Sequence, residues 1–551
     1  MTDSAPPAAS PPSEPDSGRR ALARSSVLVA TGTMLSRVTG LGRIVALAWA
    51  LGGASLADVY NLANVTPNVV YELLTGGILT AAIVPLFVRQ LHEDDERGTS
   101  AVVTVTLTVV AALTALTLVL SPLIARLLTL GADAADNDAR RRVLTVLLAC
   151  FVPQIFFYAL TTLLTSLLNA HRRFVAAAYA PVANNIVVIG VLLAFGVVTE
   201  GEPGWADVTR ARGAVGMLLL LGLGTTAGVA TTALVLVPVL RRARVRIRPV
   251  LDWRDPGVGA IARLSGWTFG YVAANQVAQV FVLVLAGSGP PGDVTAFVYA
   301  FTFYVLPYSL LAVSLMTTLA PEFARRTVTD DLPGLRRDFA LGLRYLVVLM
   351  VPASAAFVVL AHPMLGVLRI GRFGAASAAM TADTLQLFAL SLLPFSVYLY
   401  ALRAFYATEG TRTPFLLNLG ENLTNVVLAL VLYPAHGIRG LAVAWSVAYS
   451  AAALAALAVL RTRVGRGIGA GVRGAAVRAA AGALALVAVA APVAGVIGRA
   501  GPGRAFTACV IAGGLGAAAY AAVLAATRSA ELREMLGLVR RSRRRAPGVP
   551  R

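Results

Sequence analysis

The sequence lacks lysine altogether and contains few ionisable side chains of any kind. All 47 residues counted as lysine or arginine are arginine, and charged residues make up only 13% of the 551 positions, compared with roughly 25% in soluble domains. Hydrophobic residues reach 57%, and the mean hydropathy is +0.75. This composition excludes a large soluble domain and indicates a polytopic membrane protein.

Cysteine and histidine are also scarce. The two cysteines, Cys150 and Cys509, lie far apart in apolar stretches, so the sequence does not support a disulfide framework. The four histidines have no metal-ligand spacing, and no phosphate-binding loop of the form G-x-x-x-x-G-K-S/T occurs. We therefore expect no metal, no cofactor and no catalytic site, which favours a transporter over an enzyme.

Apolar stretches fill most of the chain and predict fourteen membrane-spanning helices. A bilayer core about 30 Å thick needs roughly 20 apolar residues per helix, and such stretches follow one another with short loops between them. The predicted spans are residues 25–51, 58–88, 101–130, 143–168, 175–198, 213–240, 257–287, 293–321, 338–361, 378–406, 414–433, 438–460, 475–498 and 504–527. The fold class is therefore predicted to be all-α.

The net charge of +20 comes from arginines at the ends of these spans, which is typical of membrane topology rather than of nucleic-acid binding. The even-numbered loops carry most of them, for example Arg172 and Arg173, whereas several odd-numbered loops have none. The positive-inside rule then places both termini in the cytoplasm. The arginines that run against this rule are Arg140, Arg141, Arg142, Arg210, Arg212, Arg369 and Arg372.

An internal repeat relates the two halves of the chain. LTAAIVPLFVRQ at 79–90 resembles LMTTLAPEFARR at 315–326, at an offset of six spans, which preserves topology and predicts two parallel six-helix lobes plus two C-terminal helices. The predicted domains are a disordered tail (1–24), an N-lobe (25–240), a basic linker (241–256), a C-lobe (257–460), a second basic linker (461–474), a helix pair (475–527) and a basic tail (528–551).

The first span contains two arginines where lipid is expected, in SRVTGLGR at 36–43. A charge at the centre of a membrane helix costs roughly 2.5–3.5 kcal/mol, so it marks function unless the side chain reaches the interface. We expect Arg37 and Arg43 to face a central cavity, with Gly40 and Gly42 as a hinge. The alternative is that Arg43 reaches the outer interface while Arg37 bonds to a carbonyl of a neighbouring helix.

Further polar residues lie in other spans. Asn61, Asn64, Asn68 and Glu72 recur every three or four residues, so they form one polar stripe on the second span, with Asp58 at its outer end. Such a stripe is expected to face water or protein.

In the second half, Asp383, Glu421 and Asn422 are candidates for an ion site, of which Glu421 lies deeper in its span. Arg403, near the inner end of its span, either faces the cavity or extends to the interface.

Four segments resemble a known family: SRVTGLGRIVALAWALG, LADVYNLANVTPN, LLTGGILTAAIVPLFVRQ and RAFYATEGTRTPF. They are similar to the MurJ/MviN lipid II flippases of the multidrug/oligosaccharidyl-lipid/polysaccharide (MOP) exporter superfamily. The resemblance implies fourteen helices, a V-shaped cavity between two lobes, and a lipid-tail groove at residues 475–527. It also implies alternating-access transport of an undecaprenyl-pyrophosphate-linked peptidoglycan precursor from the inner to the outer leaflet of the bacterial plasma membrane, for cell-wall synthesis.

The resemblance also suggests roles for individual residues. Arg37 and Arg43 match the first-span arginines of the family, and Asp58 matches its acidic residue. With Asn68, Glu72 and Arg403 they form the predicted substrate site. An ion gradient or the membrane potential would supply the energy, with cell-wall synthesis proteins as partners of a monomer.

This chain departs from the family pattern at two places. Members commonly place basic residues after the PN of span two and an arginine in span eight, whereas this chain has Val69, Val70, Tyr71 and Glu72 in the first place and Thr302 in the second. Two alternatives therefore stay open: a flippase for another polyprenyl-linked glycan or a paralogue with a non-essential role, and a drug or ion antiporter of the same superfamily (MATE type). Carboxylates should dominate the cavity of an antiporter for cationic drugs.

Overall fold

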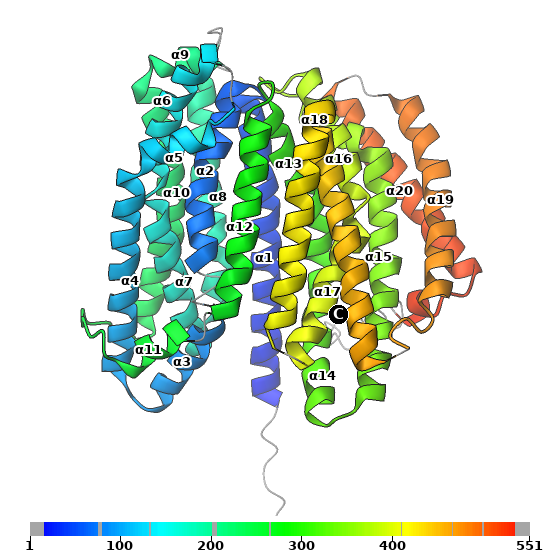
Figure 1. The fold of residues 1–551 in the computed structure, drawn as a ribbon, viewed down its shortest axis with the longest axis horizontal. Helices are drawn as coiled ribbons and strands as arrows, with labels where there is room; N and C mark the ends of the chain where they lie inside the picture. Colours follow the sequence, from blue (N-terminus) through cyan, green and yellow to red (C-terminus); the bar gives the residue numbers. More distant parts are fainter. Residues whose placement is uncertain are drawn as a thin grey trace, which may run out of the picture.

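The computed structural model describes residues 16–74, 80–131, 134–200, 207–263, 266–408, 410–465, 467–498 and 501–534. Within these ranges the regular structure is helical and contains no strand, and the long helices run side by side in one bundle (Figure 1). The predicted all-α membrane fold is therefore confirmed.

The N-lobe is formed by the first ten helices, of which α1 begins earlier than the sequence predicts. α1 starts at Asp16, whereas the sequence predicts a first span over 25–51 behind a disordered tail, and residues 1–15 of that tail lie outside the described residues. The helices are α1 (Asp16–Leu51), α2 (Ser55–Leu74), α3 (Thr80–His92), α4 (Glu96–Val119), α5 (Ser121–Leu128), α6 (Ala134–Phe151), α7 (Gln154–Ala170), α8 (Phe174–Val198), α9 (Val208–Arg212) and α10 (Val215–Arg242).

The C-lobe and the two final helices follow. One of them, α18, is bent at Gly437, whose backbone is non-helical (φ 56°, ψ −141°), at the position where the sequence predicts the boundary between two spans. The helices are α11 (Pro256–Arg263), α12 (Gly266–Gly287), α13 (Asp293–Pro307), the π-helical turn η2 (Tyr308–Ala312), α14 (Val313–Val328), α15 (Leu332–Val367), α16 (Ala375–Ala389), α17 (Leu392–Thr408), α18 (Arg412–Val464), α19 (Val472–Ile497) and α20 (Pro502–Ala526).

Within the described residues, 11 helices are long and apolar enough to cross a membrane, or 12 if the bent pair α16 and α17 forms one span. The kinked α18 counts once in these numbers although it covers two predicted spans. The second predicted span is divided into α2 and α3, with residues 75–79 outside the described part. The chain is thus a multi-pass membrane protein, and the count of fourteen stays a prediction.

Small residues allow the helices to approach one another closely. A Cβ atom on Gly196 of α8 would lie 2.0 Å from the ring of Trp49, so glycine is needed there for α1 to pack on α8. Likewise, Gly482 of α19 lies under the ring of Tyr520 of α20, whose hydroxyl donates to the carbonyl of Val348 on α15 at 2.7 Å. Such small-residue contacts are the usual basis of helix packing in lipid, and they attach the final helix pair to α15.

Candidate functional site

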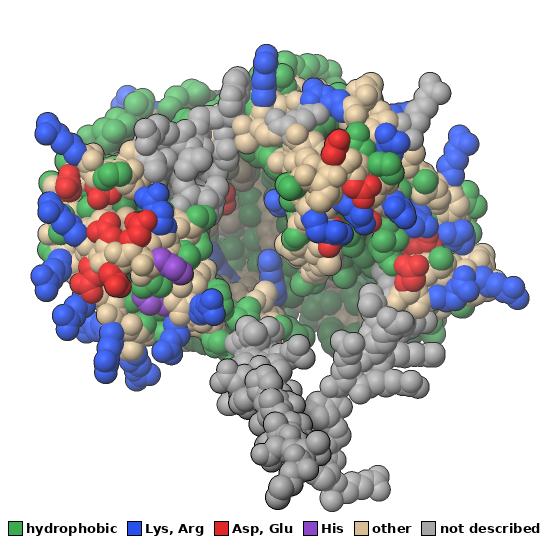
Figure 2. All heavy atoms as spheres, turned by 90° about the horizontal axis from the view of Figure 1, so that it is seen from below, with side chains coloured by type: hydrophobic (Ala, Val, Ile, Leu, Met, Phe, Trp, Pro, Cys, Tyr) green, Lys and Arg blue, Asp and Glu red, His purple; other side chains and the backbone are tan. Residues whose placement is uncertain are grey.

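Arg37 and Arg43 line one cavity of about 360 Å³ between the two lobes. Its walls come from α1, α2 and α8 of the N-lobe and from α13 of the C-lobe. Seen from the end of the bundle where α1 begins, the molecule is hollowed between the lobes (Figure 2). The polar lining residues besides the two arginines are Ser36, Asn61, Asn64, Asn185, Tyr299 and Thr302.

The two arginines reach this cavity from a helix without a break. The lining positions on α1 recur every three or four residues, from Ser36 through Gly40 to Leu47, and so form one helical stripe with Arg37 and Arg43 at its edges. This placement agrees with the cavity-facing interpretation. Because α1 is continuous through Gly40, the proposed glycine hinge is not needed to bring the arginines together, and it stays a prediction.

The charged side chains that line the cavity are all positive. Among the residues that line it, only Arg37 and Arg43 carry a charge at neutral pH, and none is a carboxylate. Thr302 also lines it, at the position where the family resemblance leads us to expect an arginine, and its hydroxyl donates to the carbonyl of Val298 at 2.7 Å. The geometry therefore suits a compact anion held by two guanidinium groups.

Asn185 contributes to the cavity wall, although the sequence analysis does not predict it as a site residue. Its side-chain amide donates to the carbonyl of Ser36 at 3.2 Å and to the hydroxyl of Thr39 at 3.0 Å, which holds α8 against the arginine-bearing part of α1. The pair Asn184–Asn185 inside an otherwise apolar span was the available signal, because buried amides in lipid need partners.

Several predicted site residues lie away from this cavity. Asn68 donates to the backbone carbonyl of Asn64 on its own helix at 2.7 Å, and the exposed Glu72 lies one turn further along α2. Arg403, on α17, is also exposed and interacts electrostatically with Tyr308 and Tyr406. None of these three residues is among those that line the cavity with Arg37 and Arg43, although Asn68 bonds to Asn64, which does.

Asp58 also lies outside the cavity, in a contact between the lobes. Its side chain is buried and accepts three hydrogen bonds at the start of α13: from the amide of Gly292 at 2.6 Å, and from the amide and hydroxyl of Thr295 at 2.8 and 2.6 Å. A carboxylate at a helix N-terminus satisfies amides that have no partner within the helix. Asp58 thus joins the N-lobe to the C-lobe.

Arg372, in the turn between α15 and α16, makes a second contact between the lobes. Its guanidinium donates to the carbonyl of Ala50 at the end of α1 at 2.6 Å, and to the carbonyl and hydroxyl of Thr199 at the end of α8 at 2.7 and 2.8 Å. Burial lowers the pKa of Arg372, while the charge of Glu200 acts in the opposite direction. An arginine starts from so high a pKa that it stays charged.

We call the contacts made by Asp58 and Arg372 the latch. They lie at the end of the bundle where α1 and α8 finish and α13 begins (Figure 1). The lobes are therefore joined at this end, which we call the latched face, and separated by the hollow at the other. This is the arrangement of a transporter open toward one side of the membrane.

A family model described as "Lipid II flippase MurJ" matches residues 47–499, which is most of the chain. The chain belongs to the lipid II flippase MurJ family. Membership confirms the prediction of a transporter rather than an enzyme, and of a lipid-linked substrate in the membrane.

Curated members of the MurJ family resemble the chain over most of its length. A protein of Rhizobium meliloti (strain 1021), named "Probable lipid II flippase MurJ", is 30% identical over 458 residues, which are 81% of this chain and 82% of that protein. A "Lipid II flippase MurJ" of Burkholderia cenocepacia is 27% identical, with 76% of this chain and 80% of that protein covered.

Solved structures share the fold. One described as "Lipid II flippase MurJ, inward closed conformation" matches with a TM-score of 0.72 and 20% identity, covering 93% of this chain and all of that one. An inward-facing MATE family transporter of the MOP superfamily matches with a TM-score of 0.62 and 15% identity, covering 80% of this chain and 98% of that one. The fold that the resemblance to the MOP exporters implies is therefore confirmed.

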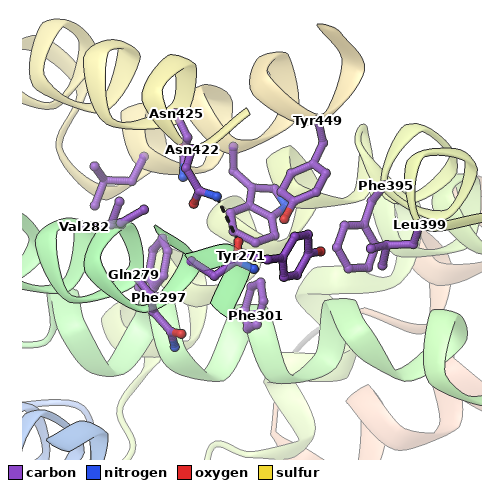
Figure 3. A pocket seen from close by; sticks show the side chains of 14 residues that line it. Tyr271, Gln279, Val282, Phe297, Phe301, Phe395, Leu399, Asn422, Asn425 and Tyr449 are labelled. Atoms are coloured by element: carbon purple, nitrogen blue, oxygen red, sulfur yellow. Dashed lines mark hydrogen bonds between the residues drawn. The ribbon is translucent and has the colours of Figure 1, made fainter. Parts of the chain in front are cut away.

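This MurJ family chain contains a second cavity, of about 280 Å³, inside the C-lobe (Figure 3). It is lined by aromatic rings and by amides from α12 and α18, and Asn275 accepts hydrogen bonds from Asn418 and Asn422, both at 2.9 Å. Next to Asn422 in the sequence, Glu421 is buried with neither carboxylate oxygen hydrogen-bonded to a described residue. A buried carboxylate without a partner needs a proton or a cation.

The third predicted coupling residue, Asp383, is in a different environment. Its carboxylate pairs with Arg439 and lies 3.1 Å from Nε2 of His362, so its charge is already compensated. Glu421 and Asn422 are neighbours on α18, of which only Asn422 lines the cavity, and Asp383 lies in a separate environment.

The latch leads to a first prediction. Asp58→Ala should leave the amides of Gly292 and Thr295 without an acceptor, at about 3 kcal/mol in total, because each unsatisfied buried donor costs about 1–3 kcal/mol. We expect the equilibrium to shift more than about a hundredfold toward separation of the lobes at the latched face. Asp207→Ala is the control, because Asp207 caps α9 within the N-lobe by accepting from the amide of Thr209.

The separation is measured as a distance between spin labels at Thr209→Cys in the N-lobe and Ala376→Cys in the C-lobe, both exposed, in a background without Cys150 and Cys509. Unchanged distances in the Asp58→Ala protein, or an equal change in the Asp207→Ala protein, would contradict the role of the latch.

Proposed function

We propose that this chain is a lipid II flippase, which moves the undecaprenyl-pyrophosphate-linked peptidoglycan precursor from the inner to the outer leaflet by alternating access. The observation that carries the proposal is the cavity between the lobes with Arg37 and Arg43 and no lining carboxylate. A pyrophosphate is a compact anion that matches paired guanidinium groups. The named relatives and the family model support the same substrate.

The proposal includes an orientation and a path for the lipid. The distribution of arginines supports cytoplasmic termini in a bacterial plasma membrane, so that the hollow in Figure 2 faces the cytoplasm and the latched face points outward. The polyprenyl chain would stay in lipid against α19 and α20, while a single copy of the protein carries the headgroup. Cell-wall synthesis proteins would supply and consume the lipid.

A second candidate keeps the mechanism and changes the cargo. Thr302 in the cavity wall replaces an expected cation, and Glu72 stands where basic residues are common in the family. A cavity with fewer cations favours a less charged polyprenyl-linked glycan or a paralogue with a non-essential role. The MATE-type antiporter receives no support, because cationic drugs require carboxylates that the residues lining the cavity do not provide.

Depletion of the protein in its own cells separates these candidates. If the protein is a lipid II flippase, lipid II should accumulate on the inner leaflet during depletion, and re-expression should reverse the accumulation. Normal outer-leaflet lipid II, together with accumulation of another polyprenyl-linked glycan, would replace the first candidate with the second. Normal levels of all such lipids would contradict both.

We further propose that Glu421 couples transport to an ion gradient or to the membrane potential, with Asn422 beside it. Glu421→Gln keeps the size of the side chain and removes its charge, so it should eliminate most transport while the lipid still binds in the central cavity. Transport and lipid binding, measured separately in proteoliposomes with an imposed gradient, test this. Asp383→Asn is the matched control, and gradient-dependent transport by Glu421→Gln protein would exclude the role.

A further inference from the structure

Four arginines converge on a pocket of about 490 Å³ in the N-lobe, separate from the central cavity and from the latch. Arg126 comes from α5, Arg141 and Arg142 from α6, and Arg212 from α9. These helices meet near the latched face (Figure 1). Three of the four arginines are among those that run against the positive-inside rule, so their position calls for a physical reason.

The walls of this pocket are apolar and border the lipid. Besides the four arginines and Thr145, they are formed by Pro122, Val143, Val146, Val215 and Leu218. The neighbouring surface is apolar as well, since Leu123, Leu127 and Val215 are each 51% exposed. The pocket thus combines four cations with apolar lining residues, and exposed apolar side chains lie beside it.

The four cations have no anionic partner in the described part of the chain. No carboxylate lines the pocket, and no ion pair joins any of the four to a described acidic residue. Arg141 makes one weak contact, from Nη2 to the side-chain oxygen of Asn137 at 3.4 Å, while its Nε is buried without a hydrogen-bond partner. Like charges brought together without counter-charges repel one another, so the pocket is stabilised by an added anion.

We propose that this pocket binds the phosphate-bearing headgroup of an anionic lipid, with the hydrocarbon chain lying along the exposed leucines of α5. Guanidinium groups match phosphate oxygens through paired hydrogen bonds, and basic pockets between membrane helices are typical sites for anionic headgroups. Two lipids share this chemistry: a bulk phospholipid such as phosphatidylglycerol and a polyprenyl pyrophosphate. The pocket is a site outside the transport path, and its existence does not depend on the proposed function.

The test uses the exposed pair Arg142 and Arg212, whose replacement leaves the core intact. The purified full-length protein is titrated in detergent with phosphatidylglycerol, undecaprenyl pyrophosphate or phosphatidylcholine, and bound lipid is counted by native mass spectrometry. Arg142→Gln/Arg212→Gln should bind its anionic ligand about 30-fold more weakly, from about 1 kcal/mol per cation. Arg142→Lys/Arg212→Lys keeps the charge and should lose less, and Arg504→Gln, exposed at the start of α20, should bind as the unmodified protein does.

The outcomes distinguish the two sources. A loss confined to phosphatidylglycerol assigns the pocket to bulk lipid, and a loss confined to the pyrophosphate assigns it to the polyprenyl carrier. Unchanged binding of both anionic lipids overturns the proposal, as does an equal loss of phosphatidylcholine, which would show that charge is not the determinant. Melting temperatures in lipid-free detergent verify that each variant is folded.

Discussion

Arg37→Ala and Arg43→Ala should each abolish complementation of cells depleted of the protein, while its abundance in the membrane stays normal. These two side chains supply the positive charge among the residues that line the central cavity, so either substitution removes half of it. Loss of one charge-assisted pair costs about 1.5–3 kcal/mol, which lowers substrate affinity by about 10- to 150-fold. Growth curves and quantitative membrane blots are the measurements.

Two matched variants sharpen this test. Arginine to lysine at either position keeps the charge but loses the paired donors, so partial growth is expected. Arg504→Ala removes an exposed arginine far from the cavity and should complement fully. If cells with Arg37→Ala and Arg43→Ala grow normally, the arginines have a structural role only and the cavity does not bind an anion.

A covalent bond across the latch should stop transport completely and reversibly. A Cβ atom on Gly53 would lie 2.7 Å from the Cβ of Ser377, so these positions of the two lobes are in contact, and a shift of about 1 Å gives the spacing of a disulfide. Gly53→Cys/Ser377→Cys, in a background without Cys150 and Cys509, should be inactive after oxidation because alternating access requires these positions to separate.

The lock has its own controls. Reduction should restore transport, and each single cysteine variant should be active under oxidising conditions. A disulfide within one lobe is the matched comparison: Gly222→Cys lies close enough to the native Cys150, and both belong to the N-lobe. Full transport by the oxidised Gly53→Cys/Ser377→Cys protein would show that the lobes do not part at this face.

The sequence was sufficient for the fold class and for the position of Arg37 and Arg43 in the wall of a cavity. Hydropathy, the repeat and the cost of a charge in lipid all follow from the residues of short segments, so they can be judged without knowing which residues touch in the folded protein. It was not sufficient for all the polar residues of α2. Asn61 and Asn64 line the cavity, but Asp58 accepts from the amide of Gly292, which lies 234 residues later at the start of α13, and only the packed structure reveals such a partner.

The arginines that run against the positive-inside rule illustrate the same limit. A rule based on loop charge treats Arg372 and Arg212 as exceptions of one kind. The structure separates them, because Arg372 donates to backbone carbonyls across the lobes while Arg212 lines a pocket without a carboxylate. Arginines on the side of the membrane where the positive-inside rule does not expect them were thus the best signal in the sequence for the latch and for the four-arginine pocket, neither of which the sequence identified.

The latch is reciprocal: each lobe provides one charged side chain, which bonds to main-chain groups and one threonine hydroxyl of the other lobe. Asp58 of the N-lobe accepts from amides at the start of α13, and Arg372 of the C-lobe donates to the carbonyls of Ala50 and Thr199. Main-chain groups are the same for every residue type. Selection for these bonds therefore acts mainly on the two charged side chains and the two threonine hydroxyls, whereas Ala50, which offers only its carbonyl, is constrained by its complete burial and not by the bond that it accepts.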